Sequence, residues 1–478
     1  MAYVSDRTTG RAPLGALLDL VNDWSLRRMT ELNQEVLEGR TSGAAFRLDF
    51  ARNVLEHLPA PEMLTSVQAQ RLMVILGLAG ASVGRHHQEA AEINRGTPEL
   101  AFAGLAVGTG NEPFLGYFTR LAGQTGTGHG NRDSYASLVR WNLPPAEVRW
   151  AGEQLAVLPS VFDDGLVRSY TGVPDETRFF GLLKASEVLE KAVNQQLLPL
   201  SDGSLDLGDE EALRRIARAV LLLDALRELN HHFAVLPPDQ GLGVSYFMDV
   251  FRQYAVHWQH EDIPPSGAQD AEALFRDLIV GIAMPSYPEH LRRLFPALLD
   301  DERAMLETLF SRDSVPAAAL RRAGVEPERL GQCSEPELRE IIGRHPILAA
   351  LYLLLNAHAR VAGVHLMLSK RFLFGPQRIR DREGLGDPGV VSNRSGTTGM
   401  DESRLELLTR ARHDHVLSPL RLVPIRVLEA VGRPDRIHLE MPRQHEVVVQ
   451  FTDSALSAVQ LGLPASPGVR LPGPRDAA

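Results

Sequence analysis

Apolar residues recur at spacings of three and four almost everywhere before residue 430, and this periodicity limits the possible folds more than any other feature. It is clear in Leu14–Val21, Leu72–Val83 and Leu213–Leu229. Such spacing places apolar side chains along one face of an α-helix. The alternating patterns typical of strands are nearly absent from this part of the chain. The body of the protein is therefore predicted to be all-α.

The length of 478 residues is sufficient for more than one hydrophobic core. Proline and glycine clusters predict helix boundaries at Leu58–Glu62, Leu236–Gly243 and Ile263–Gly267. We expect a smaller N-terminal helical domain in residues 1–150 and a larger helical domain in residues 151–430.

The C-terminal piece, residues 431–478, has a different pattern. Arg436–Met441 and Glu446–Phe451 alternate or are rich in β-branched residues around a proline-containing turn. We expect a short hairpin there, followed by a flexible tail.

The glycine-rich segment Gly123–Asp133 has no strand pattern before it. A dinucleotide-binding or phosphate-binding loop requires such a strand, so both interpretations are excluded. A flexible loop is expected, and His129 within it is a candidate to close over a pocket.

The net charge and the cysteine content limit the kinds of binding partner and the cellular compartment that can be expected. The net charge of −10 argues against nucleic acid, because phosphate affinity needs clustered basic residues. Cys333 is the only cysteine, so the chain can form no internal disulfide and hold no iron–sulfur cluster alone. The N-terminus shows no secretory signal. A cytoplasmic protein without a membrane span is expected, because polar residues interrupt the longest apolar segment.

That longest apolar segment, Ile347–Phe374, contains His365. An imidazole in such surroundings needs a partner for each ring nitrogen, and a metal ion on Nε2 is one solution. Haem iron with a single protein ligand fits better than zinc, because the chain has no HExxH or CxxC spacing. A core histidine bonded to a carbonyl is the alternative. His358 lies seven residues earlier and within about 20° on the same helix face, so spacing does not choose between them.

The stretch Arg360–Leu420 resembles the proximal helix and substrate loop of the haem enzymes that include the indoleamine and tryptophan 2,3-dioxygenases. The shared order is a histidine before a Lys-Arg-Phe-Leu helix end (VHLMLSKRFL), the glycine-threonine loop Arg394–Met400 (RSGTTGM), and the polar helix Leu405–His415. Arg168–Glu176 (RSYTGVPDE) is similar to a signature of the monodechloroaminopyrrolnitrin synthase branch. Thr398 departs from the family, which usually has another glycine in this loop.

Three further segments follow the family's order. Arg178–Val188 resembles the distal helix that covers one haem face. Phe247–Trp258 resembles the helix that contacts the substrate, and Ser266–Gly281 resembles the loop and helix beside the haem.

The resemblance implies a haem b cofactor and assigns roles to particular residues. His365 would be the axial ligand of the iron. Arg252 would pair with a substrate carboxylate. Asp277 and Arg360 would orient the proximal site or hold a propionate, although a structural Asp277–Arg360 salt bridge is an equal alternative. The remaining expected site residues are the apolar walls Phe247 and Leu183, the distal-edge residues Ser266 and Gly267, and the loop residues Gly396 and Thr397.

The expected function is a haem-dependent oxygenase that acts on tryptophan or a related aromatic amino acid with dioxygen. Leu183 stands where the family often has a polar distal group, which is compatible with more than one reaction. Oxidative rearrangement or decarboxylation of a tryptophan derivative in secondary metabolism is one alternative. A non-enzymatic helical ligand-binding or interaction protein is the other.

Overall fold

A computed structural model describes residues 14–127, 132–150, 152–282, 284, 286–433 and 447–451. The structure is 67% helix and 5% strand, which confirms the predicted all-α class. The expected strand 436–441, the C-terminal tail and His129 lie outside the described residues.

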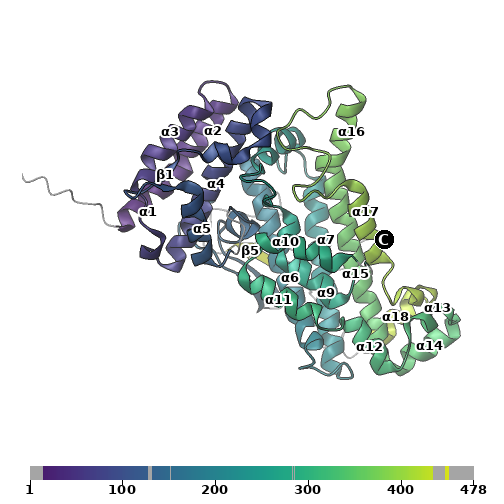
Figure 1. The fold of residues 1–478 in the computed structure, drawn as a ribbon. Coiled ribbons are helices and arrows are strands. Elements are labelled where there is room, and N and C mark those ends of the chain that lie inside the picture. The colour runs from purple at the N-terminus through teal and green to yellow at the C-terminus, as the bar shows by residue number, and fades with distance from the viewer. Residues whose placement is uncertain are drawn as a thin grey trace, which may run out of the picture.

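One group of helices comes from the N-terminal part of the chain and lies to one side of the molecule (Figure 1). Its centre is α4, whose N-terminus is fixed by a capping box. The Thr65 hydroxyl accepts a hydrogen bond from the Gln68 backbone N–H at 3.3 Å, and the Thr65 N–H donates to the Gln68 side chain at 2.9 Å. The helices are α1 Leu14–Asp23, α2 Met29–Leu37, α3 Gly43–Asn53, α4 Ser66–Ala90 and α5 Phe114–Thr125.

A second group contains the long helices α6, α7 and α15, with α9 and α17 packed beside them (Figure 1). Their bounds are α6 Pro174–Ser201, α7 Glu210–Val235, α9 Ala271–Val280, α15 Pro346–Ser369 and α17 Glu402–His413. These helices include the expected distal and proximal helices and the helix beside the expected haem.

Shorter helices surround these two groups. They are α8 Val244–Tyr246, α10 Tyr287–Leu294, α11 Asp300–Phe310, α12 Val315–Ala323, α13 Pro327–Gln332, α14 Glu335–Arg344, α16 Gly375–Arg382 and α18 Ile425–Gly432. Two π-helical segments, η7 Phe247–Phe251 and η11 Lys370–Phe374, continue α8 and α15. The 3-10 turn η8 Arg252–Tyr254 follows η7 directly, and the 3-10 turn η9 Gly267–Gln269 precedes α9. Two further π-helical segments are η1 Trp24–Arg28 and η6 Ala136–Arg140. The remaining 3-10 segments are η2 Leu55–His57, η3 Pro61–Met63, η4 Glu92–Gly96, η5 Pro98–Phe102, η10 Phe295–Ala297 and η12 Ser418–Leu422.

The structure contains strands before residue 430, where the sequence predicted none. The strand β5 Val447–Phe451 forms as expected and pairs with β3 Ala146–Trp150, with Val148 opposite Val449, whereas its expected hairpin partner lies outside the described residues. β3 also pairs with β4 Glu153–Leu158, which gives an antiparallel sheet of order β4-β3-β5. No strand was predicted before residue 430, because these segments are too short for a clear alternation. A small ribbon, β1 Ala106–Val107 with β2 Glu112–Pro113, was missed for the same reason.

The glycine-rich segment is also different from its prediction. α5 continues to Thr125 and ends at Gly126, whose φ of 68° favours glycine. Arg132 is buried, and its guanidinium lies 2.8 Å from the Asp133 carboxylate and 3.0 Å from that of Asp262. The end of this segment is therefore a buried ion-pair network and not a flexible loop.

Two described helical stretches, α4 and Pro346–Arg382, are long and apolar enough to cross a membrane by length and composition. In each, 78% of the apolar window is buried inside the protein, which is also the property of a core helix.

Candidate functional site

An apolar cavity of about 170 Å³ lies beside α6, and we call it the inner cavity. Aromatic rings form much of its wall. The Phe247 ring meets that of Phe179 edge-on, with centroids 5.4 Å apart, and lies 6.3 Å from that of Phe372. The cavity is lined by Tyr135, Leu138, Val139, Tyr170, Phe179, Phe180, Leu183, Phe247, Phe251, Arg252, Ala255, Pro265, Ser266, Gly267, Gly396 and Thr397.

Seven of the ten site residues expected from the sequence line this cavity. Leu183 comes from α6, Ser266 and Gly267 come from the turn before α9, and the others come from the η7–η8 segment and the 396–397 loop. A Cβ atom at Gly267 would lie 3.7 Å from the Leu183 side chain, so these two residues are close neighbours on the cavity wall. Tertiary folding thus brings together residues from four separate segments.

Arg252 is a buried cation on the wall of this cavity, with 6% of its surface exposed. Its Nη2 atom donates to the carbonyl of Ser392 at 2.7 Å and to that of Ser395, while its Nε–H has no acceptor among the described residues. Burial lowers the pKa of Arg252 to about 10, although the negative charge of Asp387 raises it in part. No ion pair joins the guanidinium to a described carboxylate, so this charge lacks the direct partner that a buried ion normally needs.

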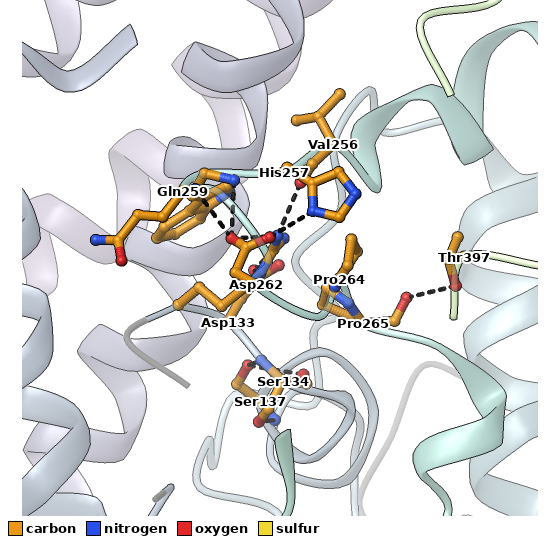
Figure 2. Close-up of polar contacts among 12 residues, drawn as sticks. Asp133, Ser134, Ser137, Val256, His257, Gln259, Asp262, Pro264, Pro265 and Thr397 are labelled. Carbon is orange, nitrogen blue, oxygen red and sulfur yellow. Dashed lines mark hydrogen bonds and ion pairs between the residues drawn. The ribbon is translucent and has the colours of Figure 1, made fainter. Parts of the chain in front are cut away.

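The glycine-threonine loop is fixed in place by contacts with two other segments. The Gln253 side chain donates to the Val391 carbonyl at 3.2 Å and accepts from the Val391 N–H at 2.8 Å. The Thr397 hydroxyl donates to the Pro265 carbonyl at 3.2 Å (Figure 2). The left-handed position of the loop is Gly399, with φ of 76°, so Thr398 does not need the freedom of the family's glycine.

A second and larger space, about 660 Å³, lies on the other side of Arg252, and we call it the outer groove. Arg252, Ala255, Gly396 and Thr397 line both spaces. The two spaces are therefore neighbours separated by Arg252 and the glycine-threonine loop.

His365 lies on the second half of α15, outside the described lining of both spaces. Most residues of α15 up to Ala362 are buried, whereas none in the range 363–370 is, and His365 itself is solvent-accessible. Desolvation by the surrounding protein nevertheless lowers the pKa of His365. The His365 side chain is therefore accessible to a ligand although much protein surrounds it.

The structure separates His365 from His358. The His358 ring is buried, its Nδ1 accepts a hydrogen bond from Arg276 Nε at 3.1 Å, and its Nε2 lies 3.0 Å from the Asp277 carboxylate. Both ring nitrogens therefore have protein partners. His358 is a structural histidine, and His365 is the one that remains available to a ligand.

Asp277 belongs to the network around His358. It accepts hydrogen bonds from Arg412 at 2.6 and 3.1 Å and from the Tyr287 hydroxyl. Burial alone raises the pKa of Asp277, but Arg412 and His358 hold it far below its usual range.

The Asp277–Arg360 salt bridge considered from the sequence does not form. Arg360 is exposed and pairs with Asp224 of α7 at 2.7 Å. Because Arg360 follows His358 by two residues, it lies about 200° around the helix and faces away from Asp277.

A metal site made only of protein ligands is not seen in the part of the chain that the structure describes. No group of three or more His, Cys, Asp or Glu side chains converges there.

Sequence reasoning missed several residues of the inner cavity. Tyr135 directly precedes η6, in a segment without a recognisable motif. Phe179 precedes Leu183 by four residues and lies on the same face of α6, so helical spacing could have indicated it. Upstream of α6, Tyr170 also lines the cavity, while the neighbouring Ser169 hydroxyl accepts a hydrogen bond from the Gly172 N–H at 3.1 Å.

The chain matches no protein-family model, and no curated protein shows significant sequence similarity to it. The likeness to haem dioxygenases therefore remains a prediction from the residues quoted above.

The buried His358 predicts a pH dependence of stability. Desolvation lowers its pKa from 6.5 to about 4, so between these values the unfolded chain binds a proton that the folded protein does not. The free energy of unfolding should fall as pH falls through this window, with about 1–3 kcal/mol from His358. His358→Gln should flatten the decline measured by urea unfolding. An identical slope in wild type and variant would contradict this assignment.

Proposed function

We propose that this protein is a haem-dependent oxygenase acting on tryptophan or a related aromatic amino acid. The observation that carries the proposal is Arg252, a buried arginine without an anionic partner on the wall of an aromatic cavity. The same fold leaves His365 as the single accessible histidine on the apolar helix α15.

The residues present fit a haem group. Residues 363–369 of α15 are mostly apolar but incompletely buried, as expected of a helix surface that a large apolar group would cover. His365 would supply the axial ligand, and Gly267 would allow close approach at the distal edge. Bound haem would supply dioxygen activation, while the protein supplies burial and orientation.

The inner cavity suits the aromatic ring of the substrate. Its volume of about 170 Å³ can hold a ring but is below the roughly 300–1,000 Å³ of pockets that enclose a whole drug-sized ligand. Phe247 and Phe179 would contact the ring, and Leu183 would keep the far wall free of hydrogen-bond donors. The polar end would then lie at the boundary with the outer groove.

Arg252 is placed to hold the substrate carboxylate at this boundary. Its planar guanidinium suits a two-point grip on a carboxylate, and such an ion pair would satisfy a charge that the fold leaves without a direct partner. Thr397 and the backbone of Gly396 border the same point and offer polar groups to a substrate amine.

Absorption spectroscopy tests the cofactor. Titration of the purified protein with haem should give a Soret band that saturates at one haem per chain. A non-enzymatic helical protein would give only the spectrum of free haem, and that result would exclude the proposal.

Isotope labelling tests the reaction. With tryptophan, a reductant and labelled dioxygen, a ring-opened product should retain two labelled oxygen atoms. An unlabelled or decarboxylated product would favour the rearrangement reaction expected from the Arg168–Glu176 signature. Within that segment, Glu176 accepts a hydrogen bond from the Tyr170 N–H at 2.6 Å and so holds Tyr170 beside the cavity.

A further inference from the structure

The outer groove contains two arginines, Arg252 and Arg293, that have no carboxylate partner among the described residues, and a simple aromatic amino acid would use only one of them. Arg252 lies at its boundary with the inner cavity, and Arg293 of α10 is exposed in the groove. Arg293 donates to His290 Nδ1 at 3.2 Å, and no ion pair joins it to a carboxylate of a described residue. Burial and the neighbouring Arg293 lower the pKa of His290 to about 4, so His290 is a neutral acceptor that orients this guanidinium.

The acidic residues of the groove do not neutralise these arginines. Asp262 accepts from Arg132 at 3.0 Å, from the Trp258 N–H at 2.8 Å and from the Gln259 N–H at 3.2 Å. Glu261 is the other acid in the lining, and its carboxylate lies 3.9 Å from His260 Nδ1, with both side chains exposed.

His257 adds a fixed polar group to the groove. Its Nδ1 lies 2.7 Å from the Asp262 carboxylate, and Figure 2 shows the ring held against that carboxylate. Because Asp262 is itself fixed by Arg132 and two backbone N–H groups, the ring orientation is set. The other nitrogen, Nε2, remains available to a ligand in the groove.

We propose that the outer groove binds a second anionic group of the substrate, so that the substrate is an aromatic amino acid whose amine carries an acidic acyl chain. This inference rests on the proposed function, because it places the ring in the inner cavity and the α-carboxylate at Arg252. The acyl chain would then extend past Thr397 into the groove towards Arg293. The volume of about 660 Å³ accommodates such a chain, which free tryptophan would leave unused.

Calorimetric titration of the full-length protein, with and without added haem, tests this inference. The probes are N-succinyl-tryptophan and N-succinamoyl-tryptophan, which differ only in a terminal carboxylate or carboxamide. Wild type should bind the succinyl compound more tightly by about two- to fivefold, the range expected for an exposed ion pair. The preference should shrink as salt is added.

Arg293→Gln should abolish that preference without changing the affinity for tryptophan. Arg292→Gln is the matched control, because Arg292 is adjacent on the same helix but lies over the Phe310 ring at 4.8 Å and does not line the groove. It should keep the preference.

The outcomes separate this inference from the proposed function. If tryptophan binds and wild type shows no preference, or Arg293→Gln keeps it, the second anion site is excluded while the proposed function stands. If tryptophan does not bind but the succinyl compound is preferred over the succinamoyl compound in a way that needs Arg293, the groove site stands and tryptophan is excluded as the substrate. If neither binds, both proposals fail.

Discussion

Replacing His365 by alanine is expected to abolish stoichiometric haem binding. The substitution removes the one accessible imidazole of α15, and His358 cannot replace it because both of its nitrogens are occupied by Arg276 and Asp277. Haem titration followed at the Soret band measures the loss. Added imidazole should restore a bound spectrum, since it can occupy the space that the side chain leaves.

His358→Ala is the matched control for this experiment. It should retain haem binding, but it should lower the free energy of unfolding by about 1–3 kcal/mol, because it leaves buried polar atoms of Arg276 and Asp277 without their His358 partner. Loss of haem in His358→Ala with a normal spectrum in His365→Ala would reverse the ligand assignment. Retention of haem in both variants would exclude α15 as the source of the ligand.

Replacing Arg252 by leucine is expected to weaken the binding of a carboxylate-bearing aromatic ligand by about 2–5 kcal/mol, since the variant leaves a buried carboxylate unpaired. Haem content should stay near the wild-type value. Affinities for tryptophan and for tryptamine, which lacks the carboxylate, measure the effect. Wild type should prefer tryptophan, and the variant should not.

Arg252→Lys is the control for charge alone. Lysine keeps the positive charge but lacks the planar fork, so the preference for tryptophan should be partly lost. Arg252 also holds the glycine-threonine loop through Ser392 and Ser395, and thermal unfolding should therefore accompany each binding measurement. If wild type binds tryptophan and tryptamine equally, Arg252 is not a carboxylate site.

Local sequence was sufficient to predict much of the helical framework. Helical periodicity gave the helices around Leu72–Val83 and Leu213–Leu229, observed as α4 and α7, and proline clusters gave boundaries such as that at Ile263–Gly267. These signals are local, because a residue's helix face and a proline's missing N–H depend only on near neighbours. Seven of the residues named from the motif order, among them Arg252, line one cavity, and their proposed roles remain predictions.

The tertiary structure decided what depends on distant partners. The choice between His358 and His365 depends on Arg276 and Asp277, which approach from α9, and the partner of Asp277 is Arg412 and not Arg360.

The pairing of β5 with β3 could not be predicted from local sequence either, since about 300 residues separate Ala146 from its partner Phe451. Sequence determined which segments are helical and which residue types are available, because those properties follow from short-range backbone geometry. Only the packed structure determined which buried charges are paired and which, like that of Arg252, lack a carboxylate, because that depends on side chains brought together from remote parts of the chain.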